Sequence, residues 1–485
     1  MNNALARRGF LQGSIAVAAL AWSPAARSWV GGQPPGPDTI EIPSLDGELV
    51  TDAATREQAA DDFGHIVHRA PIAVLVPGSV EDIVKMIHFA RAHRIKVAGA
   101  RGIGASHGTN GQAQVEGGVV IDMSALDQIH EIDGDSALVD AGVRWIDLLA
   151  QTAPLGKSPP TLTDFIGLSV GGTLSVGGIG GQAFRHGLQV DNVLELEVVT
   201  GKGKRVTCSP TEHAELFHAA RAGLGQFGII VRARIKLVDV APMVRTYTAV
   251  YTDLAVLTAD QEAAADSGQF DYVEGSAFWA GAGWQYQIEL AKYYDPAAPP
   301  DDAALLAGLH ALPGTQAATD ASYFDFANRL APLLGFLESI GAMALPHPWI
   351  DQFVPGSSVV PFVESVLSQI TPADTGNGPI LIYPFNRSKL TAPFLRVPDE
   401  PRIYLLAILR FTVPPIPEVV AAQIAQNRAF FDANTAIGGK LYPIDSVPMS
   451  RDDWEAHFEP YWDGFEDAKD RFDPDFVLTP GQGIF

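Results

Sequence analysis

The chain has 485 residues, of which 47% are hydrophobic and 18% charged, with a formal net charge of −23 and one cysteine, Cys208. This length exceeds what one hydrophobic core usually serves, so we expect two domains, sequential or intertwined. The negative charge argues against nucleic acid, whose phosphates require clustered Lys and Arg, and against an anionic membrane surface. A single cysteine excludes an intrachain disulfide and a cysteine-based metal site, and its place in the run VTCS favours an inert buried thiol.

Residues 1–28 have the layout of an export signal. Arg7 and Arg8 precede GFLQ, the apolar run IAVAALAW follows, and small residues such as Ala25 come next. A charged start, a short apolar segment and a small-residue exit are typical of such signals, and the paired arginines favour the twin-arginine route. The run is shorter than the ~20 residues that a membrane span needs. We therefore expect a periplasmic or secreted protein without stable membrane insertion.

Strands and glycine-rich turns dominate the chain up to about residue 238, after a Gly/Pro-rich spacer, GGQPPGPD. Residues 72–76 predict a buried strand, and Ser79 with Asp82 predicts a capping box at the start of an amphipathic helix. Further strands are expected at KVAGA, GGVVIDM and SALVDAG, with a helix from Trp145. NVLELEVVT and KRVTCS predict a hairpin around Gly201, and GIIVRARIKLV alternates apolar with charged residues as a strand does.

The pattern of predicted elements changes between about residues 240 and 440, which indicates a second domain. Here predicted helices, TADQEAAADS and DDAALLAGLHAL, alternate with predicted strands, WQYQIELAKYY and RIYLLAILRFTV. After this region, DDWEAHFEPYWDGFEDAKDRF predicts one helix, and an extended tail follows. The fold class is therefore α+β.

Common cofactor and catalytic motifs are missing or lack their structural frame. GIGGQA at residues 178–183 matches a relaxed dinucleotide fingerprint, but no clean strand precedes it and no βαβ unit encloses it. A nicotinamide site is therefore not expected. The HExxH zinc motif and the GxSxG nucleophile elbow are absent, and we expect no metal site.

Two glycine-rich loops remain, AGARGIGASHGTNGQA and DFIGLSVGGTLSVGGIGGQAFRHG. Glycine at this density lets backbone N–H groups approach a ligand closely, as a pyrophosphate or a flat ring requires. Each loop carries one distinctive polar residue, His107 in the first and Asp164 in the second. Taken alone, His107 could be a satisfied loop histidine, and Asp164 after Thr163 could be a helix cap.

The order of these segments resembles that of the cytokinin dehydrogenases, members of the vanillyl-alcohol-oxidase superfamily with its PCMH-type FAD-binding domain. The resemblance extends over nearly the whole chain after the signal, through VPGSVEDIV, TDFIGLSVGGTLSVGGIGGQAFRHG, GLGQFGIIVRARI, PHPWIDQFVP and FDPDFVLTPGQGIF. It implies a two-domain α+β fold. An FAD-binding domain would cover residues 40–238, an inserted α+β substrate-binding domain residues 239–440, and residues 441–485 would return to the FAD domain.

The resemblance also implies the cofactor and its contacts. FAD would be attached covalently to His107, because the spacing from this histidine to Gln112 and on to GGVVIDM matches that of the family. The loop before His107 is two residues longer than the family pattern, and Gly108 replaces a serine. Cys208 lies far from the position of a second link, so single attachment is expected. The implied cofactor contacts are His107, Gly102, Gly104, Ser106, Gly108, Gln112, Asp164, Ser169, Ser175, Ile179, Ile230, Tyr442 and Gln482.

By the same resemblance, Asp164 is the catalytic base, Glu274 in DYVEGS is a second acidic group that contacts the substrate, and Trp349 in PHPW lines the site. Hydride transfer from a carbon next to nitrogen requires a base for the amine proton. The implied substrate is a cytokinin, an N6-alkenyl adenine of the isopentenyladenine type. The imine product would hydrolyse to adenine and an aldehyde, and dioxygen or a quinone would take the electrons.

Two other functions stay open. The same scaffold could serve a covalent-flavin oxidase of another amine or of an alcohol, because a fold does not fix its substrate. A flavin-binding carrier or sensor without turnover is the second alternative. The presence of both His107 and Asp164 argues against this second reading.

Overall fold

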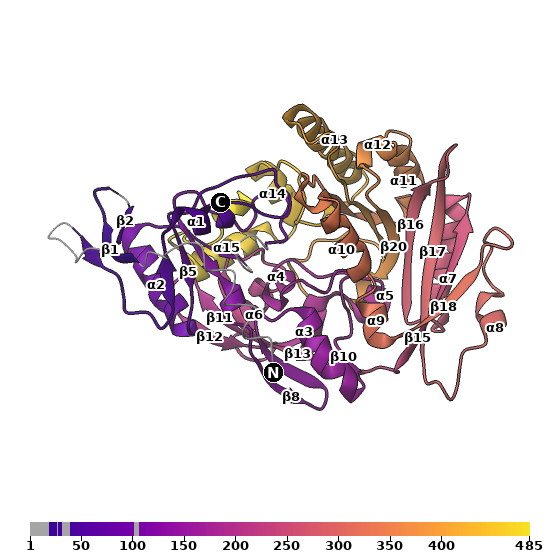
Figure 1. The fold of residues 1–485 in the computed structure, drawn as a ribbon, viewed down its shortest axis with the longest axis horizontal. Coiled ribbons are helices and arrows are strands. Elements are labelled where there is room, and N and C mark those ends of the chain that lie inside the picture. The colour runs from indigo at the N-terminus through magenta and orange to yellow at the C-terminus, as the bar shows by residue number, and fades with distance from the viewer. Residues whose placement is uncertain (1–18, 27, 32–38, 101–105) are drawn as a thin grey trace.

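The computed structural model describes residues 19–26, 28–31, 39–100 and 106–485. They form an elongated molecule of mixed helices and strands (Figure 1). The N-terminal half and the C-terminal tail build one end, and a large sheet with its helices builds the other (Figure 1). Among the described residues, no helix is both long and apolar enough to cross a membrane.

A four-stranded sheet lies at the N-terminal end, in the order β4-β5-β7-β6. Its strands are β4 (Glu48–Val50), β5 (Ala73–Val76), β6 (Val97–Ala100) and β7 (Val119–Asp122), and its helices are α1 (Ala53–Ala59) and α2 (Val80–His93). β7 pairs in parallel with β5 and β6 and is buried throughout, as in a parallel sheet covered on both faces. The C-terminal tail joins this sheet, because Val477 O and Thr479 N bond to the backbone of Val97.

A five-stranded antiparallel sheet follows, in the order β12-β11-β13-β9-β8. Its strands are β8 (Ile129–Asp133), β9 (Ser136–Asp140), β11 (Val193–Thr200), β12 (Arg205–Cys208) and β13 (Gly228–Lys236). The predicted hairpin of β11 and β12 is confirmed, and from Val231 onward β13 alternates buried apolar residues with the more exposed Arg232, Arg234 and Lys236, as predicted. Cys208 is buried, and burial raises the pKa of its thiol to about 12, so it is inert.

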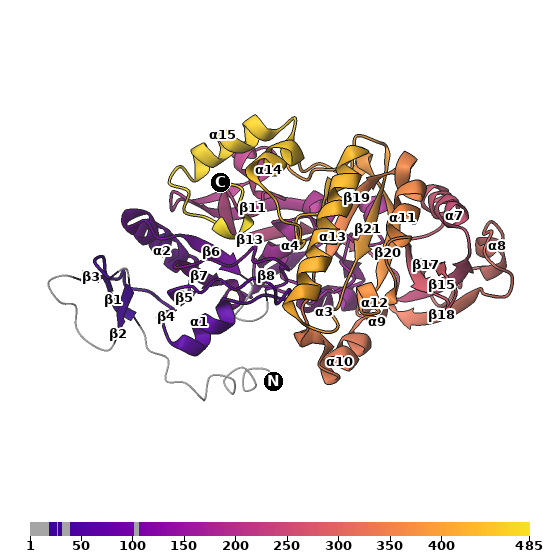
Figure 2. The same ribbon diagram turned by 90° about the horizontal axis from the view of Figure 1, so that it is seen from above.

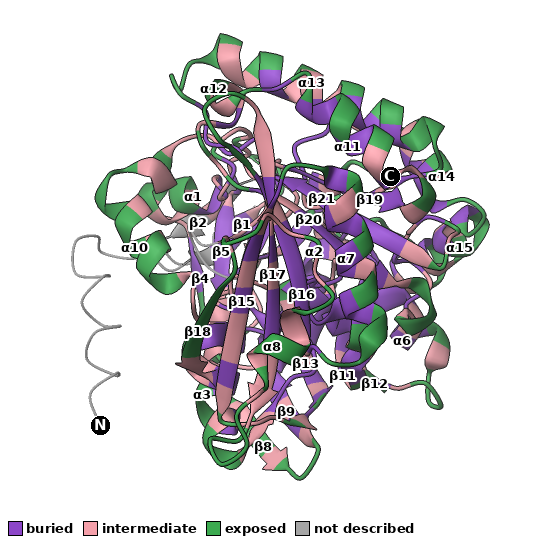
Figure 3. Cartoon of the chain, turned by 90° about the vertical axis from the view of Figure 1, so that its right-hand side faces the viewer, coloured by how far each residue is buried: buried purple, intermediate pink, exposed green. Residues whose placement is uncertain are grey.

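An eight-stranded antiparallel sheet builds the other end, in the order β18-β15-β17-β16-β20-β21-β19-β22. Its strands are β15 (Met243–Tyr251), β16 (Tyr272–Trp279), β17 (Trp284–Tyr294), β18 (Ala317–Ser322), β19 (Ile350–Pro355), β20 (Ile380–Asn386), β21 (Arg402–Ile408) and β22 (Lys440–Leu441). Figure 3 shows buried residues along β16 and β17 and exposed residues along the edge strand β18.

The two faces of this sheet pack into different cores. Tyr272 of β16 and Leu405 of β21 belong to a core shared with the four- and five-stranded sheets. Their neighbours Val273 and Leu406 belong to a second core, on the opposite face. The helices of that face are α7 (Leu254–Ser267), α11 (Val359–Leu367) and α13 (Pro417–Ala436), the last of which is seen lengthwise in Figure 2. The first face therefore meets the rest of the molecule.

Shorter elements connect these layers. They are α3 (Trp145–Thr152), β10 (Lys157–Ser158), α4 (Val170–Leu174), α5 (Ala183–His186), α6 (Ala214–Ala220), β14 (Val238–Asp239), α9 (Tyr323–Ala327), α10 (Ala331–Ser339) and α12 (Pro372–Thr375). Near the N-terminus, β1 (Ala19–Ser23) pairs with β2 (Ser28–Gly31) and with β3 (Ile40–Glu41). Arg7 and Arg8 of the predicted export signal lie outside the described residues.

The predicted capping box at α2 is wrong. Ser79 is the N-cap residue, but its Oγ donates to Asp46 Oδ2 at 2.7 Å instead of bonding to the helix. The Asp82 carboxylate accepts hydrogen bonds from the backbone N–H groups of Asp46, Gly47 and Gly78 at 2.8 to 2.9 Å. A contact between distant segments thus replaces the local one.

Two predicted helices are also wrong in extent. In DDAALLAGLHAL only α8 (Asp302–Leu306) is helical, because Gly308 and Pro313 follow and both disfavour a helix. The single helix predicted near the C-terminus is divided into α14 (Arg451–Phe458) and α15 (Trp462–Phe472). Pro460 lies at the break, where it lacks a backbone donor and its ring prevents helical continuation.

Candidate functional site

Asp164 lies in the loop between β10 and α4, where its carboxylate meets side chains from the eight-stranded sheet. Its Oδ1 atom accepts hydrogen bonds from the Tyr272 hydroxyl at 2.9 Å and from Arg329 Nη2 at 2.7 Å. Tyr272 begins β16, and Arg329 follows α9. The Asp164 side chain keeps 20% of its surface exposed, so solvent and small molecules reach it. The predicted base therefore lies at the junction of the two ends of the molecule.

Glu274, the second predicted acidic group, faces Glu289 directly across β16 and β17. Arg329 lies between these two glutamates and Asp164. Its Nη2 is 3.5 Å from Glu274 Oε2, and its Nε is 3.3 Å from Glu289 Oε1. One cation therefore joins three carboxyl groups, two of which sequence reasoning had selected.

Burial, followed by repulsion from Asp164, raises the pKa of Glu274 well above its usual value. Glu274 Oε1 is buried without a hydrogen-bond partner among the described residues. A raised pKa favours the protonated carboxyl group, which donates a hydrogen bond. Asp164 forms an ion pair with Arg329 at 2.7 Å. The site thus presents a carboxylate acceptor beside a carboxylic acid donor.

His107 lies in an aromatic cluster built from segments far apart in the sequence. The ring of Phe63 is parallel to the imidazole, with centroids 4.3 Å apart, and it also stacks on His347 at 4.1 Å. Trp349 packs edge-on against His107 at 5.5 Å, and Phe165 lies at 5.5 Å. Because Phe165 directly follows Asp164, the structure brings the predicted flavin anchor, the predicted base and the predicted wall of the site together.

Backbone hydrogen bonds hold the loop that carries His107. Phe63 N donates to Ser106 O at 2.9 Å, and Gly64 N donates to Gly108 O at 3.1 Å. A Cβ atom on Gly64 would approach Thr109 O to 2.2 Å, so this close backbone contact requires glycine. The segment around Phe63 is thereby fixed against the predicted flavin loop.

The buried carboxylate of Asp62 also holds this loop through hydrogen bonds. It accepts hydrogen bonds from Gly111 N at 2.7 Å and from Gly64 N at 3.0 Å. Burial raises the pKa of Asp62 to about 7, although both hydrogen bonds lower it. The protonation of one buried side chain is therefore coupled to the structure of the loop.

The second glycine-rich loop passes buried polar atoms that have no partner among the described residues. Gly178 has φ of +75°, and a Cβ atom there would approach Gln189 Oε1 to 2.1 Å. Gly178 N donates to the Tyr442 hydroxyl at 2.8 Å. Both polar side-chain atoms of Gln189 and the Oε1 atom of Gln182 are buried and unpaired. Because buried polar atoms are normally paired, this cradle fits a large polar ligand such as FAD.

Three further predicted flavin contacts lie in this loop, and a fourth, Ile230, lies in β13. Ser169 Oγ caps α4 by accepting a hydrogen bond from Gly172 N at 3.4 Å. Ser175 ends the same helix, and its Oγ donates to Gly171 O at 2.8 Å. Ile179 and Ile230 are buried in the same core.

The remaining predicted contacts come from the first loop and the C-terminal tail. Gln112 Nε2 donates to Asp445 O at 3.1 Å. Gln482 ends the short helix of residues 480–482, where the backbone of Gly481 packs against residues 111–114. Gly102 and Gly104 lie outside the described residues.

Several site residues were missed by sequence reasoning. Tyr272 precedes Glu274 by two residues, so the strand period alone places both on one face. Glu289 is an acid within an apolar strand, which is a signal in itself. Phe63 and Arg329 carry no such signal, because only the tertiary fold brings them to the site. Metal chemistry was not expected, and the described residues contain no group of His, Cys, Asp and Glu arranged to hold a metal ion.

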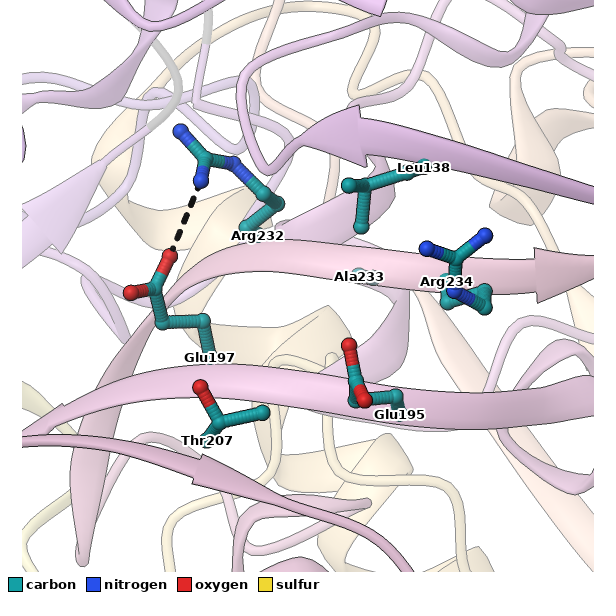
Figure 4. Close-up of a pocket in the computed structure, with 7 residues that line it drawn as sticks. All are labelled: Leu138, Glu195, Glu197, Thr207, Arg232, Ala233 and Arg234. Atoms are coloured by element: carbon teal, nitrogen blue, oxygen red, sulfur yellow. Dashed lines mark ion pairs between the residues drawn. The ribbon is translucent and has the colours of Figure 1, made fainter. Parts of the chain in front are cut away.

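A hollow of about 120 Å³ lies elsewhere, over the five-stranded sheet (Figure 4). It is lined by Leu138, Glu195, Glu197, Thr207, Arg232, Ala233 and Arg234. Within it, Arg232 Nη1 pairs with Glu197 Oε2 at 3.3 Å, whereas Arg234 pairs with Glu131, which does not line the hollow. None of the predicted site residues lines it, so it is a separate feature of the surface.

Comparison with known proteins agrees with this architecture. Residues 71–209 match the family model described as FAD binding domain, and residues 279–485 match the model described as cytokinin dehydrogenase 1, FAD and cytokinin binding. The chain therefore has an FAD-binding domain and a second domain of the cytokinin-binding type, the two-domain PCMH-type fold predicted from the sequence.

Full-length relatives are similar over nearly all of the chain. A Rhodococcoides fascians protein named uncharacterized oxidoreductase ORF5 in fasciation locus is 41% identical over 439 residues, covering 90% of this chain and 99% of the relative. Cytokinin dehydrogenase 2 of Arabidopsis thaliana is 38% identical over 485 residues, covering 92% and 95%. Cytokinin dehydrogenase 9 of Oryza sativa subsp. japonica is 35% identical over 491 residues, covering 93% and 92%. With the FAD domain, this similarity makes the chain a member of the cytokinin dehydrogenase family of FAD-binding oxidoreductases.

Proposed function

We propose that the protein oxidises an N6-alkenyl adenine, such as isopentenyladenine, at the C–N bond that joins the side chain to the purine. The observation that carries this proposal is the pairing of Asp164 with Glu274 around Arg329. An acceptor carboxylate beside a donor carboxylic acid suits a ligand with both an amine N–H and a ring nitrogen acceptor. The name of the Arabidopsis relative, cytokinin dehydrogenase 2, supports this substrate class.

In this proposal Asp164 accepts the proton of the secondary amine, while Glu274 donates a hydrogen bond to a purine nitrogen. Trp349 and Phe165, both close to His107, flank the flat base. The FAD group, when bound, supplies the acceptor for a hydride. The substrate thus loses a hydride from carbon and a proton from nitrogen, and the resulting imine takes up water to give adenine and an unsaturated aldehyde.

We further propose that His107 holds FAD through a covalent bond to its imidazole. The parallel ring of Phe63 and the backbone bonds to Ser106 and Gly108 support this role, because they fix the orientation of the imidazole. Tyr442, Gln182 and Gln189 would provide polar contacts to the cofactor. Digestion of the protein and isolation of the yellow peptide should identify His107 as the attachment point.

Export is part of the proposal and rests on Arg7, Arg8 and the apolar run that follows. A fusion of residues 1–38 to a reporter that must fold before export should reach the periplasm. Replacement of both arginines by lysine should retain the reporter in the cytoplasm, and export of that variant would refute the twin-arginine route.

The alternative on the same scaffold is oxidation of another amine or an alcohol, with dioxygen or a quinone as acceptor. An anaerobic titration of the purified yellow protein separates the two. Isopentenyladenine should bleach the flavin band, and its analogue with a saturated side chain should bleach it far more slowly at similar affinity, because the developing cation loses its delocalisation. Rapid bleaching by a phenolic alcohol or a simple amine alone would favour the alternative.

A further inference from the structure

Arg329 lies at the centre of the proposed catalytic site, although nothing in its sequence context singles it out. Its Nη2 contacts Asp164 Oδ1 at 2.7 Å and Glu274 Oε2 at 3.5 Å, and its Nε lies 3.3 Å from Glu289 Oε1. The same Nη2 donates to the Tyr272 hydroxyl, and the guanidinium carbon lies 4.9 Å from the Tyr272 ring centroid. A planar fork that donates in several directions suits these contacts better than a single ammonium group.

Without Arg329 the site would hold uncompensated negative charge. Glu274 and Glu289 are directly opposite on adjacent strands, an arrangement that destabilises an antiparallel sheet when both are charged. Asp164 adds a third carboxyl group. Burial is the largest cause that raises the pKa of Glu274 and of Glu289, and Arg329 acts against it in both. The arginine therefore opposes the protonation of both glutamates.

The two oxygens of Asp164 have different surroundings. In the part of the chain that the structure describes, both hydrogen bonds to this carboxylate, from Tyr272 and from Arg329, go to Oδ1. An oxygen that already accepts two hydrogen bonds is the weaker acceptor for a further proton. A ligand proton is consequently directed to Oδ2.

We propose that Arg329 is a positioning residue of the reaction: it holds Asp164 through Oδ1 and presents Oδ2 to the amine proton of the substrate. This inference rests on the proposed function, because it takes Asp164 as the base. The titratable groups that face Arg329 are Asp164 from the loop before α4, Tyr272 and Glu274 from β16, and Glu289 from β17. All four are acids, so removal of the cation acts on each in the same direction.

The test compares Arg329→Gln and Arg329→Lys with the wild-type holoenzyme across pH. In the wild type, the anaerobic rate of flavin reduction by isopentenyladenine should fall toward acid pH as the carboxyl groups around Arg329 take up protons. In R329Q this acid limb should lie about 1 to 3 pH units higher, so that the rate lost at neutral pH returns at alkaline pH. R329K keeps the charge but not the fork, so its acid limb should stay near that of the wild type with a plateau about tenfold lower.

A second measurement follows the affinity for adenine through the flavin absorbance, which requires no turnover. The adenine affinity should also fall toward acid pH, and in R329Q this fall should occur at higher pH than in the wild type. Arg245→Gln is the matched control, because Arg245 of β15, in the same sheet, pairs with Asp302 of α8 and Asp320 of β18 and not with Asp164. In R245Q the acid limbs of the reduction rate and of the adenine affinity should both be unchanged. Flavin content and Tm report folding in every variant.

An R329Q protein with its acid limb at the wild-type pH, or with the same loss of rate at every pH, would overturn the role of Arg329. If R329Q does not fold, R329K provides the test. A plateau rate of R329K equal to that of the wild type would then overturn the role of Arg329. A wild-type enzyme that isopentenyladenine does not reduce contradicts the proposed function instead, while the adenine measurement still reports on Arg329.

Discussion

Phe63 and His107 lie face to face, with ring centroids 4.3 Å apart and an interplanar angle of 9°. The stack joins a segment near the N-terminus to the loop expected to carry the flavin, and it fixes the plane of the imidazole. A nucleophile that forms a covalent bond gains from being held in one orientation. The pair is therefore a structural requirement for the attachment that we propose at His107.

Phe63→Leu should lower the fraction of covalently bound flavin, because leucine keeps an apolar side chain but removes the parallel ring. The measurement is the flavin absorbance that stays with acid-precipitated protein. Phe270→Leu is the control, since Phe270 is buried in the second core, and it should retain the wild-type fraction. His107→Ala should retain none, and a yellow H107A precipitate would show that the anchor is another residue.

Asp164→Asn should slow flavin reduction by about 100- to 10,000-fold, because asparagine keeps the shape of the side chain but cannot accept the amine proton. Flavin content should hardly change. Rapid mixing under anaerobic conditions measures the rate, with Asp147→Asn, a change to a surface ion pair with Arg144, as control. Reduction of D164N at nearly the wild-type rate would move the base elsewhere, with Glu274 next in line.

Glu274→Gln should change how adenine binding depends on pH. Burial raises the pKa of Glu274 well above its usual value, so the wild type keeps a neutral donor to higher pH than an ordinary glutamate does and loses it as pH rises through the raised pKa. Glutamine stays neutral, so E274Q should keep its affinity at alkaline pH while the wild type weakens. Adenine titrations between about pH 6 and 10 measure this. Glu262→Gln, whose carboxylate bonds to Tyr404, is the control, and parallel profiles for E274Q and the wild type would mean that Glu274 is ionised throughout.

Asp62→Asn should alter the pH dependence of stability. Burial raises the pKa of Asp62 from 3.8 to about 7, so the native state binds this proton more tightly than the unfolded chain. That contribution to the free energy of unfolding is complete below about pH 4 and is lost by about pH 7, and its size is up to about 4 kcal/mol. Asparagine takes up no proton. The wild type should therefore exceed D62N in stability most at acid pH, with a difference that shrinks toward neutrality.

Urea unfolding at several pH values between about 4 and 7 measures that difference. Burial also raises the pKa of Asp351 to about 7, but this group is present in both proteins and cancels in the comparison. Asp470→Asn, at an exposed position of α15 that does not act on Asp62, should follow the wild-type profile. A constant difference between D62N and the wild type would show that Asp62 is ionised throughout.

Sequence reasoning succeeded where local patterns decide structure. The hairpin of β11 and β12 follows from two β-rich runs around Gly201, and β13 follows from strict alternation. It failed at Ser79, because the Asp82 side chain bonds to backbone N–H groups that only the fold brings near. At the C-terminus, Pro460 interrupts the helical pattern that lies on either side of it, so that two helices form instead of one.

The site divides in the same way. His107, Asp164 and Trp349 were predicted from the resemblance to the cytokinin dehydrogenases, and in the structure Trp349 and Phe165, the residue after Asp164, both pack against the His107 ring. Arg329 was not predicted, because an isolated arginine after a short helix has no periodicity or motif. It reaches Asp164 only because the first face of the eight-stranded sheet packs against the loop before α4. A single sequence does not show which distant segments come together in the fold.

A single-turnover experiment tests the central claim, oxidation of an N6-alkenyl adenine at its C–N bond. Oxidised enzyme is mixed anaerobically with a small excess of isopentenyladenine, and the bleached flavin, adenine and aldehyde are quantified in the same sample. We predict one adenine and one unsaturated aldehyde for each flavin bleached. No bleaching at millimolar isopentenyladenine, together with rapid bleaching by a phenolic alcohol or a simple amine, would contradict the claim.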